Sequence, residues 1–276
     1  MRNNAYSIAE LEEKALALRV QVVRMVAALG MGYLQQGLGA AELFTALYFS
    51  ELRLREDDPD WPERDRMILS TAHNTAVFYA VMAARGLIPH AALADYTRDG
   101  SPLEVNASER MGSLVEATCG SLGQGLSVAV GMALSLRRRG RPSRVYVVLG
   151  DGELQEGQVW EAAMSAAGHR LANLTLIIDR NFMQVEGHTD KVVMMEPLAD
   201  KWRAFGWRVI EIDGNVMAEV VDALAAAREH DAGPTCILAR TLPGKGVPLL
   251  ENRLSHVARI TPEEAEAALQ VLGASA

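Results

Sequence analysis

Asp151 and Asn181 have the residue types and the spacing of a metal-binding pair. Each follows an apolar run of β-forming residues, 145–149 before Asp151 and 174–178 before Asn181. Alanines recur at helical spacing between the runs, which predicts two parallel strands joined by a crossover helix. The carboxyl ends of such strands form the ligand crevice of α/β proteins. A carboxylate and an amide oxygen at that edge suit Mg²⁺, which completes its octahedral shell with waters and substrate phosphates.

The segment around Asp151 also has the features of a phosphate-binding turn. Gly152 has no side chain, so a phosphate group could approach the backbone closely. Backbone N–H groups at the start of the following helix would favour the anion. Gly150-Asp151-Gly152, with Asn181 thirty positions after Asp151, resembles the thiamine diphosphate motif. This resemblance implies thiamine diphosphate and Mg²⁺ as cofactors.

The rest of the chain predicts an α/β fold. Apolar runs predict strands at 66–70, 145–149, 174–178, 208–212 and 235–239, and helical periodicity predicts helices at 8–30, 40–52, 75–84, 123–138 and 217–230. The polar residues 89–112 are expected to form a long loop. We therefore expect a single domain over residues 1–276, with a mostly parallel sheet, helices on both faces and an N-terminal helical extension at about residues 1–30.

Composition excludes several classes of partner. The formal net charge is −8 and no basic stripe is present, which argues against nucleic-acid binding. No segment reaches transmembrane length, and residues 1–19 lack the apolar core of a signal peptide. Cys119 and Cys236 lie in apolar or glycine-containing surroundings, which indicates buried thiols rather than a disulfide. We expect a cytoplasmic protein that binds a small molecule and has no membrane partner.

Motifs along nearly the whole chain resemble those of the transketolase family and follow the same order. They are 68–70 followed by His73, the glycine-rich loop 118–125, the block 150–187, the stretch 244–247, and 251–252 followed by His256. The resemblance implies a thiamine diphosphate-binding domain of the diphosphate (PP) type, from a transketolase split over two polypeptides. The pyrimidine-binding and C-terminal domains, with the glutamate that activates the cofactor, are then expected on a separate partner subunit in an α2β2 heterotetramer.

The family resemblance also implies roles for individual residues. The implied metal ligands are the side chains of Asp151 and Asn181 and the main-chain carbonyl of Met183. The implied cofactor contacts are His73, Gly120, Ser121, Leu122, Gly152, Glu153, Asn181 and His256. The implied catalytic residues are His73, Glu156 and His256. Glu156 matches an acid near the subunit contact that could relay protons, and it could equally be an ordinary glutamate in the first turn of a helix.

Two departures from the family concern the substrate. Tyr33 and Asn106 stand where the family has histidines that face the donor ketose, and with His256 they are the expected substrate contacts. The replacements remove two imidazole acid–base groups, and such groups typically contribute about 10²–10⁴-fold each. We therefore expect a transketolase-like enzyme that moves a two-carbon ketol (glycolaldehyde) unit from a non-standard ketose donor to an aldehyde, and only with its partner subunit.

Two alternatives stay open on the sequence alone. A thiamine enzyme that decarboxylates a 2-oxo acid and forms an acyloin would not need the lost histidines, because its donor lacks the C1 hydroxyl. A non-catalytic subunit retained for assembly or regulation would bind the cofactor without turnover. The intact metal motif argues against the non-catalytic subunit, whereas the sequence does not decide between the two enzymes.

Overall fold

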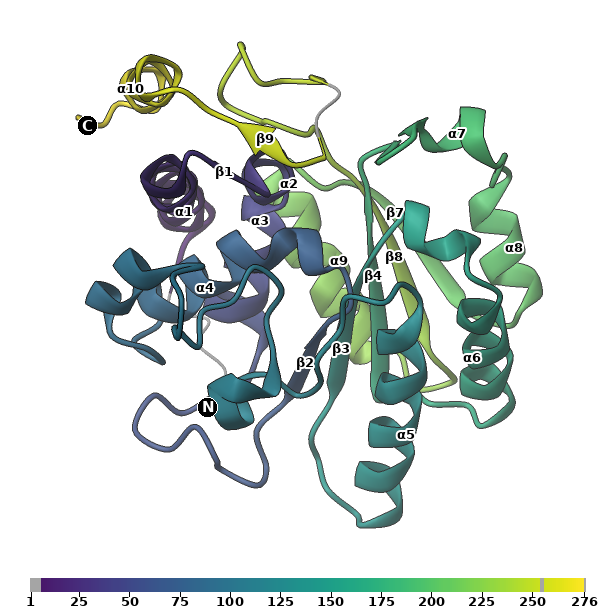
Figure 1. Ribbon diagram of the computed structural model, residues 1–276. Helices are drawn as coiled ribbons and strands as arrows, with labels where there is room; N and C mark the ends of the chain where they lie inside the picture. Colours follow the sequence, from purple (N-terminus) through teal and green to yellow (C-terminus); the bar gives the residue numbers. More distant parts are fainter. Residues whose placement is uncertain (1–5, 254–255, 276) are drawn as a thin grey trace.

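The computed structural model describes residues 6–253 and 256–275, and this part of the chain is built on a five-stranded sheet (Figure 1). The strand order is β2-β3-β4-β8-β7, and each pairing in the sheet is parallel. The strands are β2 (Arg66–Leu69), β3 (Val145–Gly150), β4 (Leu174–Arg180), β7 (Arg208–Asp213) and β8 (Thr235–Arg240). The five predicted strands and the parallel sheet are confirmed.

Helices cover both faces of the sheet, as the sequence predicts (Figure 1). One face carries α1 (Ile8–Leu29), α3 (Ala41–Ala46), α4 (Thr75–Ala84) and α9 (Met217–Glu229), and the other carries α5 (Gln124–Arg138), α6 (Gly157–Gly168) and α8 (Leu198–Ala204). Alternate residues of β3 point to opposite faces: Tyr146 and Val148 join one apolar core, and Val147 and Leu149 join the other. Burial on both faces explains why this strand is apolar throughout.

The helix predicted at 8–30 is confirmed and has clear signals at both ends. Ser7 and Glu10 form a capping box at its start, and Gly30 ends it in the left-handed conformation with φ of 77°. The helix predicted at 40–52 is present as α3, and it continues as the π-helix η1 (Leu47–Glu51).

Several short elements lie outside the sequence prediction. They are α2 (Leu34–Gly39), α7 (Thr189–Val192), α8, α10 (Pro262–Val271), the paired strands β1 (Met31–Gly32) and β9 (Ala258–Arg259), and the hairpin of β5 (Met183–Gln184) and β6 (Gly187–His188). The 3₁₀ turns are η2 (Ala72–Asn74), η3 (His90–Asp95), η4 (Glu109–Leu114) and η5 (Gly152–Gln155). Residues 89–112 are otherwise irregular, as expected.

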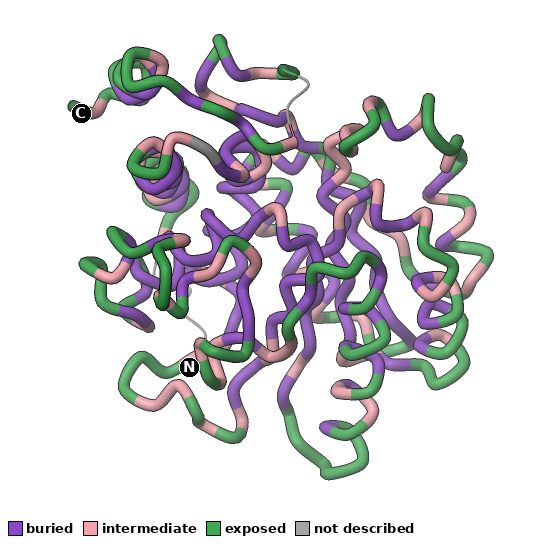
Figure 2. The backbone as a smooth tube through the Cα atoms, viewed as in Figure 1, coloured by how far each residue is buried: buried purple, intermediate pink, exposed green. Residues whose placement is uncertain are grey.

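Burial follows the layered arrangement. The inner strands are buried along their length, whereas the edge strand β7 is partly exposed (Figure 2). Cys119 and Cys236 are free and buried, which confirms the prediction of buried thiols. Within the described part of the chain, no helix has the length and apolar character needed to cross a membrane.

Candidate functional site

The structure places Asp151 and Asn181 side by side at the carboxyl edge of the sheet. β3 and β4 are parallel neighbours, and their register pairs Gly150 with Asp179. The backbone N–H of Phe182 donates a 2.6 Å hydrogen bond to Asp151 Oδ2, which ties the segment after β4 to the turn after β3. The predicted neighbouring strands are therefore confirmed, while the role of the two residues as metal ligands remains a prediction.

A second buried carboxylate, that of Asp179, lies close to Asp151. Asp151 is only 5% exposed. Burial and the nearby charge of Asp179 raise the pKa of the Asp151 carboxyl to about 7. Burial also raises the pKa of Asp179, although its carboxylate accepts hydrogen bonds from Asn74 Nδ2 at 3.0 Å and from Thr241 Oγ1. A cation beside these groups would favour their charged forms. The local electrostatics therefore fit a divalent metal ion.

The possible metal ligands are oxygen atoms of mixed type. Asn181 Oδ1 accepts a 2.9 Å hydrogen bond from Met183 N–H, so both residues belong to one tight turn. A carboxylate, an amide oxygen and a main-chain carbonyl are hard ligands of the kind that Mg²⁺ prefers. In residues 6–253 and 256–275, no group of three His, Cys, Asp or Glu side chains could hold a metal ion. A metal at this edge would therefore depend on the mixed oxygen set.

A pocket of about 240 Å³ lies beside this turn. It is lined by nine of the predicted site residues: His73, Leu122, Asp151, Gly152, Glu153, Glu156, Asn181, Met183 and His256. It is also lined by Gly150 of the predicted motif and by six residues that the sequence analysis missed: Gln36, Thr71, Gln155, Gln184, Val185 and Glu186. Most of these lie within the block 150–187 and could have been inferred from it. Gln36 comes from α2, three residues after Tyr33, and the sequence analysis did not single it out.

Tyr33, His73 and His256 form an aromatic cluster at one side of the pocket. The ring centroids of the two histidines are 4.1 Å apart, and the Tyr33 ring lies 5.0 Å from His73 and 5.6 Å from His256. Burial and the neighbouring His256 lower the pKa of His73 to about 4. Burial lowers the pKa of His256, with Glu186 acting in the opposite direction. Both imidazoles are therefore neutral at neutral pH, and the Tyr33 ring packs against them without lining the pocket.

The glycine-rich loop 118–125 contributes to the pocket mainly through Leu122. Gly120 and Ser121 are exposed and do not line the pocket. A β-carbon at Gly120 would lie 3.2 Å from Asn106 Nδ2, so the Asn106 side chain lies against this loop. Asn106 is likewise outside the pocket lining. The two expected donor-side residues, Tyr33 and Asn106, thus lie behind the residues that line the pocket.

The two predicted glutamates differ in their surroundings. Glu156 lines the pocket and is exposed in this chain. Glu153 is only 3% exposed, and its carboxylate accepts hydrogen bonds from Ser70 Oγ, from Gly123 N–H at 2.8 Å and from Gly150 N–H at 3.3 Å. The Glu153 carboxylate is therefore bound by the protein itself, whereas the Glu156 carboxylate is available to other groups.

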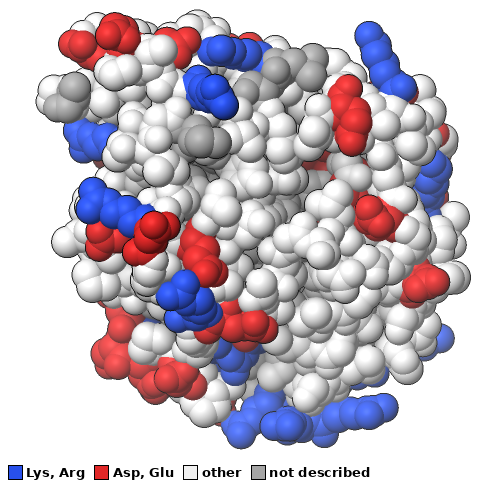
Figure 3. Space-filling model, viewed as in Figure 1, with Lys and Arg blue, Asp and Glu red and all other residues white. Residues whose placement is uncertain are grey.

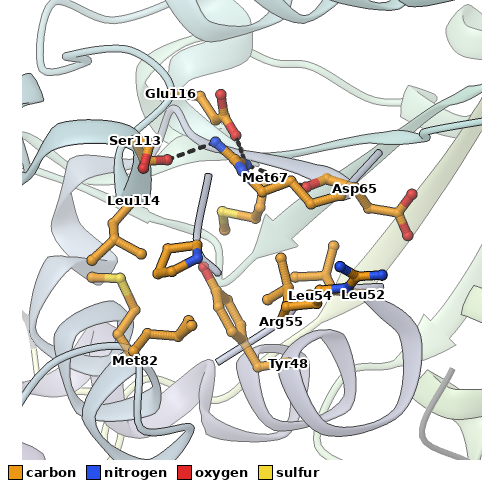
Figure 4. A pocket seen from close by; sticks show the side chains of 13 residues that line it. Tyr48, Leu52, Leu54, Arg55, Asp65, Met67, Met82, Ser113, Leu114 and Glu116 are labelled. Atoms are coloured by element: carbon orange, nitrogen blue, oxygen red, sulfur yellow. Dashed lines mark hydrogen bonds and ion pairs between the residues drawn. The ribbon is translucent and has the colours of Figure 1, made fainter. Parts of the chain in front are cut away.

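A second cavity, of about 30 Å³, lies next to Tyr48 and away from this site (Figure 4). Arg64 lies at its edge and donates hydrogen bonds to Glu116 and, at 2.7 Å, to the carbonyl oxygen of Ser113. The volume is close to that of a single water molecule. This cavity is too small for a cofactor, and Arg64 there anchors the segment that leads into the glycine-rich loop.

Residues 11–276 match the sequence model of a family described as transketolase, thiamine diphosphate binding domain. The chain belongs to the transketolase family. The match covers nearly the whole chain and agrees with the parallel sheet and the pocket at its carboxyl edge. The predicted resemblance is thus confirmed at the level of the family and of its thiamine diphosphate-binding domain.

This transketolase-family chain is similar to two kinds of relative. It is 40% identical over 264 residues to the 6-deoxy-6-sulfo-D-fructose transketolase subunit SqwG of a Clostridium species, covering 95% of this chain and 96% of the relative. It is 37% identical over 273 residues to an apulose-4-phosphate transketolase subunit of Actinobacillus succinogenes, and the match covers 98% of this chain and 99% of that subunit. It is 34% identical over 254 residues to human transketolase, covering 92% of this chain and 40% of that protein.

Solved transketolase structures have the same fold. The transketolase of Campylobacter jejuni superposes with a TM-score of 0.90 at 28% sequence identity, over 98% of this chain and 44% of that chain. This transketolase-family chain therefore spans less than half the length of that enzyme, and almost the full length of the relatives that are named as subunits.

Proposed function

We propose that this chain is the thiamine diphosphate- and Mg²⁺-binding subunit of a two-component transketolase-like enzyme. The enzyme moves a two-carbon ketol unit from a ketose donor to an aldehyde acceptor. The observation that carries the proposal is the pairing of Asp151 and Asn181 at a pocket on the carboxyl edge of the sheet. Family membership supports it, because the matched domain is described as binding thiamine diphosphate.

The metal and the diphosphate bind at the turn after β3. Asp151, Asn181 and the carbonyl of Met183 hold Mg²⁺, and the backbone at Gly152 faces the diphosphate. A β-carbon at Gly152 would lie 3.1 Å from Gln184 Cβ, so packing as well as the ligand favours glycine there. Of the other cofactor contacts that the family resemblance implies, His73, Leu122, Glu153 and His256 line the pocket, whereas Gly120 and Ser121 lie outside its lining.

Proton transfer is assigned to the two histidines of the aromatic cluster. When bound, thiamine diphosphate supplies the group that stabilises the carbanion formed as the donor's carbon–carbon bond breaks. His73 and His256 are neutral because their pKa values are lowered, so each can accept a proton at one nitrogen and donate one from the other. The exposed carboxylate of Glu156 relays protons toward the subunit contact.

The pyrimidine-binding half of the site and its glutamate come from a partner chain, in an α2β2 assembly. Relatives of this length are named as subunits, which supports a divided enzyme. Two apolar side chains at the pocket, Leu122 and Val185, are 38% and 65% exposed. The surface over α5 has little charge until its basic C-terminal end (Figure 3), and Val128 on this helix is also exposed. A second polypeptide would cover these apolar groups.

The donor is a ketose other than the common xylulose 5-phosphate. Tyr33 and Asn106 take the places of two family histidines and lie behind the pocket lining. The relatives named for 6-deoxy-6-sulfo-D-fructose and apulose 4-phosphate indicate that non-standard ketoses occur among similar subunits. These two sugars are therefore the first donors to test.

Reconstitution tests the proposed function. The purified chain, its purified partner and their equimolar mixture are each assayed for ketol transfer, with Mg²⁺ and thiamine diphosphate present. Only the mixture should turn over a ketose donor. Turnover by this chain alone would contradict the two-component assignment.

A further inference from the structure

Glu153 joins three segments beneath the pocket. Its Oε1 accepts hydrogen bonds from Ser70, which follows β2, and from Gly123 of the glycine-rich loop. Its Oε2 accepts a hydrogen bond from Gly150 at the end of β3. Residue 153 is 3% exposed, so these contacts are shielded from water. Hydrogen bonds to a buried carboxylate are stronger than those between neutral groups.

Ser70 extends the connection further along the glycine-rich loop. Its Oγ donates to Glu153 and accepts a 3.1 Å hydrogen bond from Gly125 N–H. A β-carbon at Gly125 would overlap the Ser70 side chain. Gly123 has φ of 81°, and a β-carbon there would lie 2.8 Å from Glu156 Cβ. The loop therefore fits against Ser70 and the segment after Asp151 without spare space.

We propose that Glu153 is a positioning residue that holds the glycine-rich loop in a fixed place relative to the Asp151 turn. Its carboxylate acts through Gly123 and Ser70. The metal-binding turn and the loop that covers the cofactor are thereby held as one unit. This inference rests on the proposed function, because it needs the cofactor to contact both the turn and the loop.

The chemistry of the carboxylate suggests an isosteric test. Both oxygens of Glu153 face hydrogen-bond donors. A glutamine has the same shape, but its NH₂ group is a donor and would face Gly150 N–H or the Gly123–Ser70 pair. Glu153→Gln therefore places a donor against a donor on at least one side and breaks the hydrogen bonding there without leaving a cavity. Gln158 donates to the carbonyl of Leu122 at 2.8 Å from the exposed side of the same loop, so Gln158→Ala is the matched control.

The first experiment compares two ligands on the reconstituted two-subunit enzyme. Under the proposed function, inorganic diphosphate with Mg²⁺ binds at the Asp151 turn without contacting the glycine-rich loop, whereas thiamine diphosphate contacts both. Glu153→Gln should weaken the binding of thiamine diphosphate by about tenfold or more. The same variant should change the affinity for Mg²⁺–diphosphate by less than about twofold. Gln158→Ala should have a smaller effect. Equal loss for both ligands, or no loss, would overturn the positioning role.

The second experiment uses hydrogen exchange on the chain without cofactor. The amides of Gly123 and Gly125 should exchange about tenfold faster in Glu153→Gln, while the amide of Phe182, which is bound to Asp151, keeps its protection. Unchanged exchange in the loop, or faster exchange at Phe182 as well, would reject the inference. Failure of wild-type enzyme to bind thiamine diphosphate would instead reject the proposed function.

Discussion

The buried carboxylates at the cofactor side of the pocket and the buried Asn106 oxygen at the donor side differ in how well they are paired. At the cofactor side, Asp151 and Glu153 are buried and each accepts hydrogen bonds from backbone N–H groups. At the donor side, Asn106 Oδ1 is buried and has no hydrogen-bond partner within residues 6–253 and 256–275. Such unpaired groups are costly unless a ligand or a rearrangement pairs them. The two buried carboxylates of the cofactor side are therefore held by the chain itself, whereas the Asn106 oxygen at the donor side still lacks a partner.

The largest expected effect comes from restoring the family histidines at the donor side. Wild-type enzyme should use xylulose 5-phosphate with kcat/KM below roughly 10⁴ M⁻¹s⁻¹. Tyr33→His combined with Asn106→His should raise this value by roughly 10²-fold, because imidazole acid–base groups return. The same variant should lose efficiency with the native donor, for which 6-deoxy-6-sulfo-D-fructose and apulose 4-phosphate are candidates. The measurement is steady-state kinetics of the reconstituted enzyme.

A control variant separates chemistry from packing at Tyr33. Tyr33→Phe keeps a ring against His73 and His256 and adds no imidazole. It should not improve the use of xylulose 5-phosphate. Wild-type efficiency at or above roughly 10⁴ M⁻¹s⁻¹ with that donor would show that the donor side works as in an ordinary transketolase. The contrast between the two sides would then have no bearing on substrate choice.

A smaller effect should appear in the pH dependence of stability. His73 has a pKa of about 4 in the folded chain because of burial and His256, against about 6.5 when unfolded. Between these values the unfolded chain binds a proton that the folded chain does not, so stability falls as pH falls from about 6.5 to about 4. His73→Asn should reduce the loss of thermal midpoint between pH 7 and pH 5 by roughly 4 °C. An identical loss in both proteins, measured by thermal unfolding without cofactor, would show that His73 does not titrate this way.

The smallest effect is expected at Met183. Its proposed contact with Mg²⁺ uses the main-chain carbonyl, so Met183→Ile should change the affinity for thiamine diphosphate by less than about twofold. The side chain is partly exposed, which makes the replacement tolerable. Calorimetric titration of the reconstituted complex would measure this. A tenfold loss would mean that the Met183 side chain, and not its backbone, matters at this site.

The arrangement of Asp151 and Asn181 could be predicted from sequence because two buried strands determine it. Apolar runs joined by a helical segment leave parallel neighbours as the favoured topology, and the residues after them must then meet. The five strands and two buried thiols were likewise predictable from local patterns. The two-residue strands β1 and β9 were not, because elements this short have no periodicity.

Side-chain surroundings at the site were less predictable than backbone positions. Glu153 lies in the motif, but its partners Ser70 and Gly123 come from distant segments, so its inward orientation leaves no local signal. Asp179 is a buried acid at the end of an apolar strand, and this unusual position could have drawn attention to it. Tyr33 was expected to contact substrate, and only the fold places its ring against two histidines.

The most direct test of the account is a calorimetric titration of thiamine diphosphate into the complex of this chain with its partner subunit. Wild-type complex should bind the cofactor saturably and only with Mg²⁺ present. Asp151→Ala removes the charged ligand and should weaken binding by about 100-fold, since even residues that only support a metal ligand typically contribute 10–100-fold. Unchanged affinity in Asp151→Ala would contradict the assignment of this site as the metal and diphosphate centre.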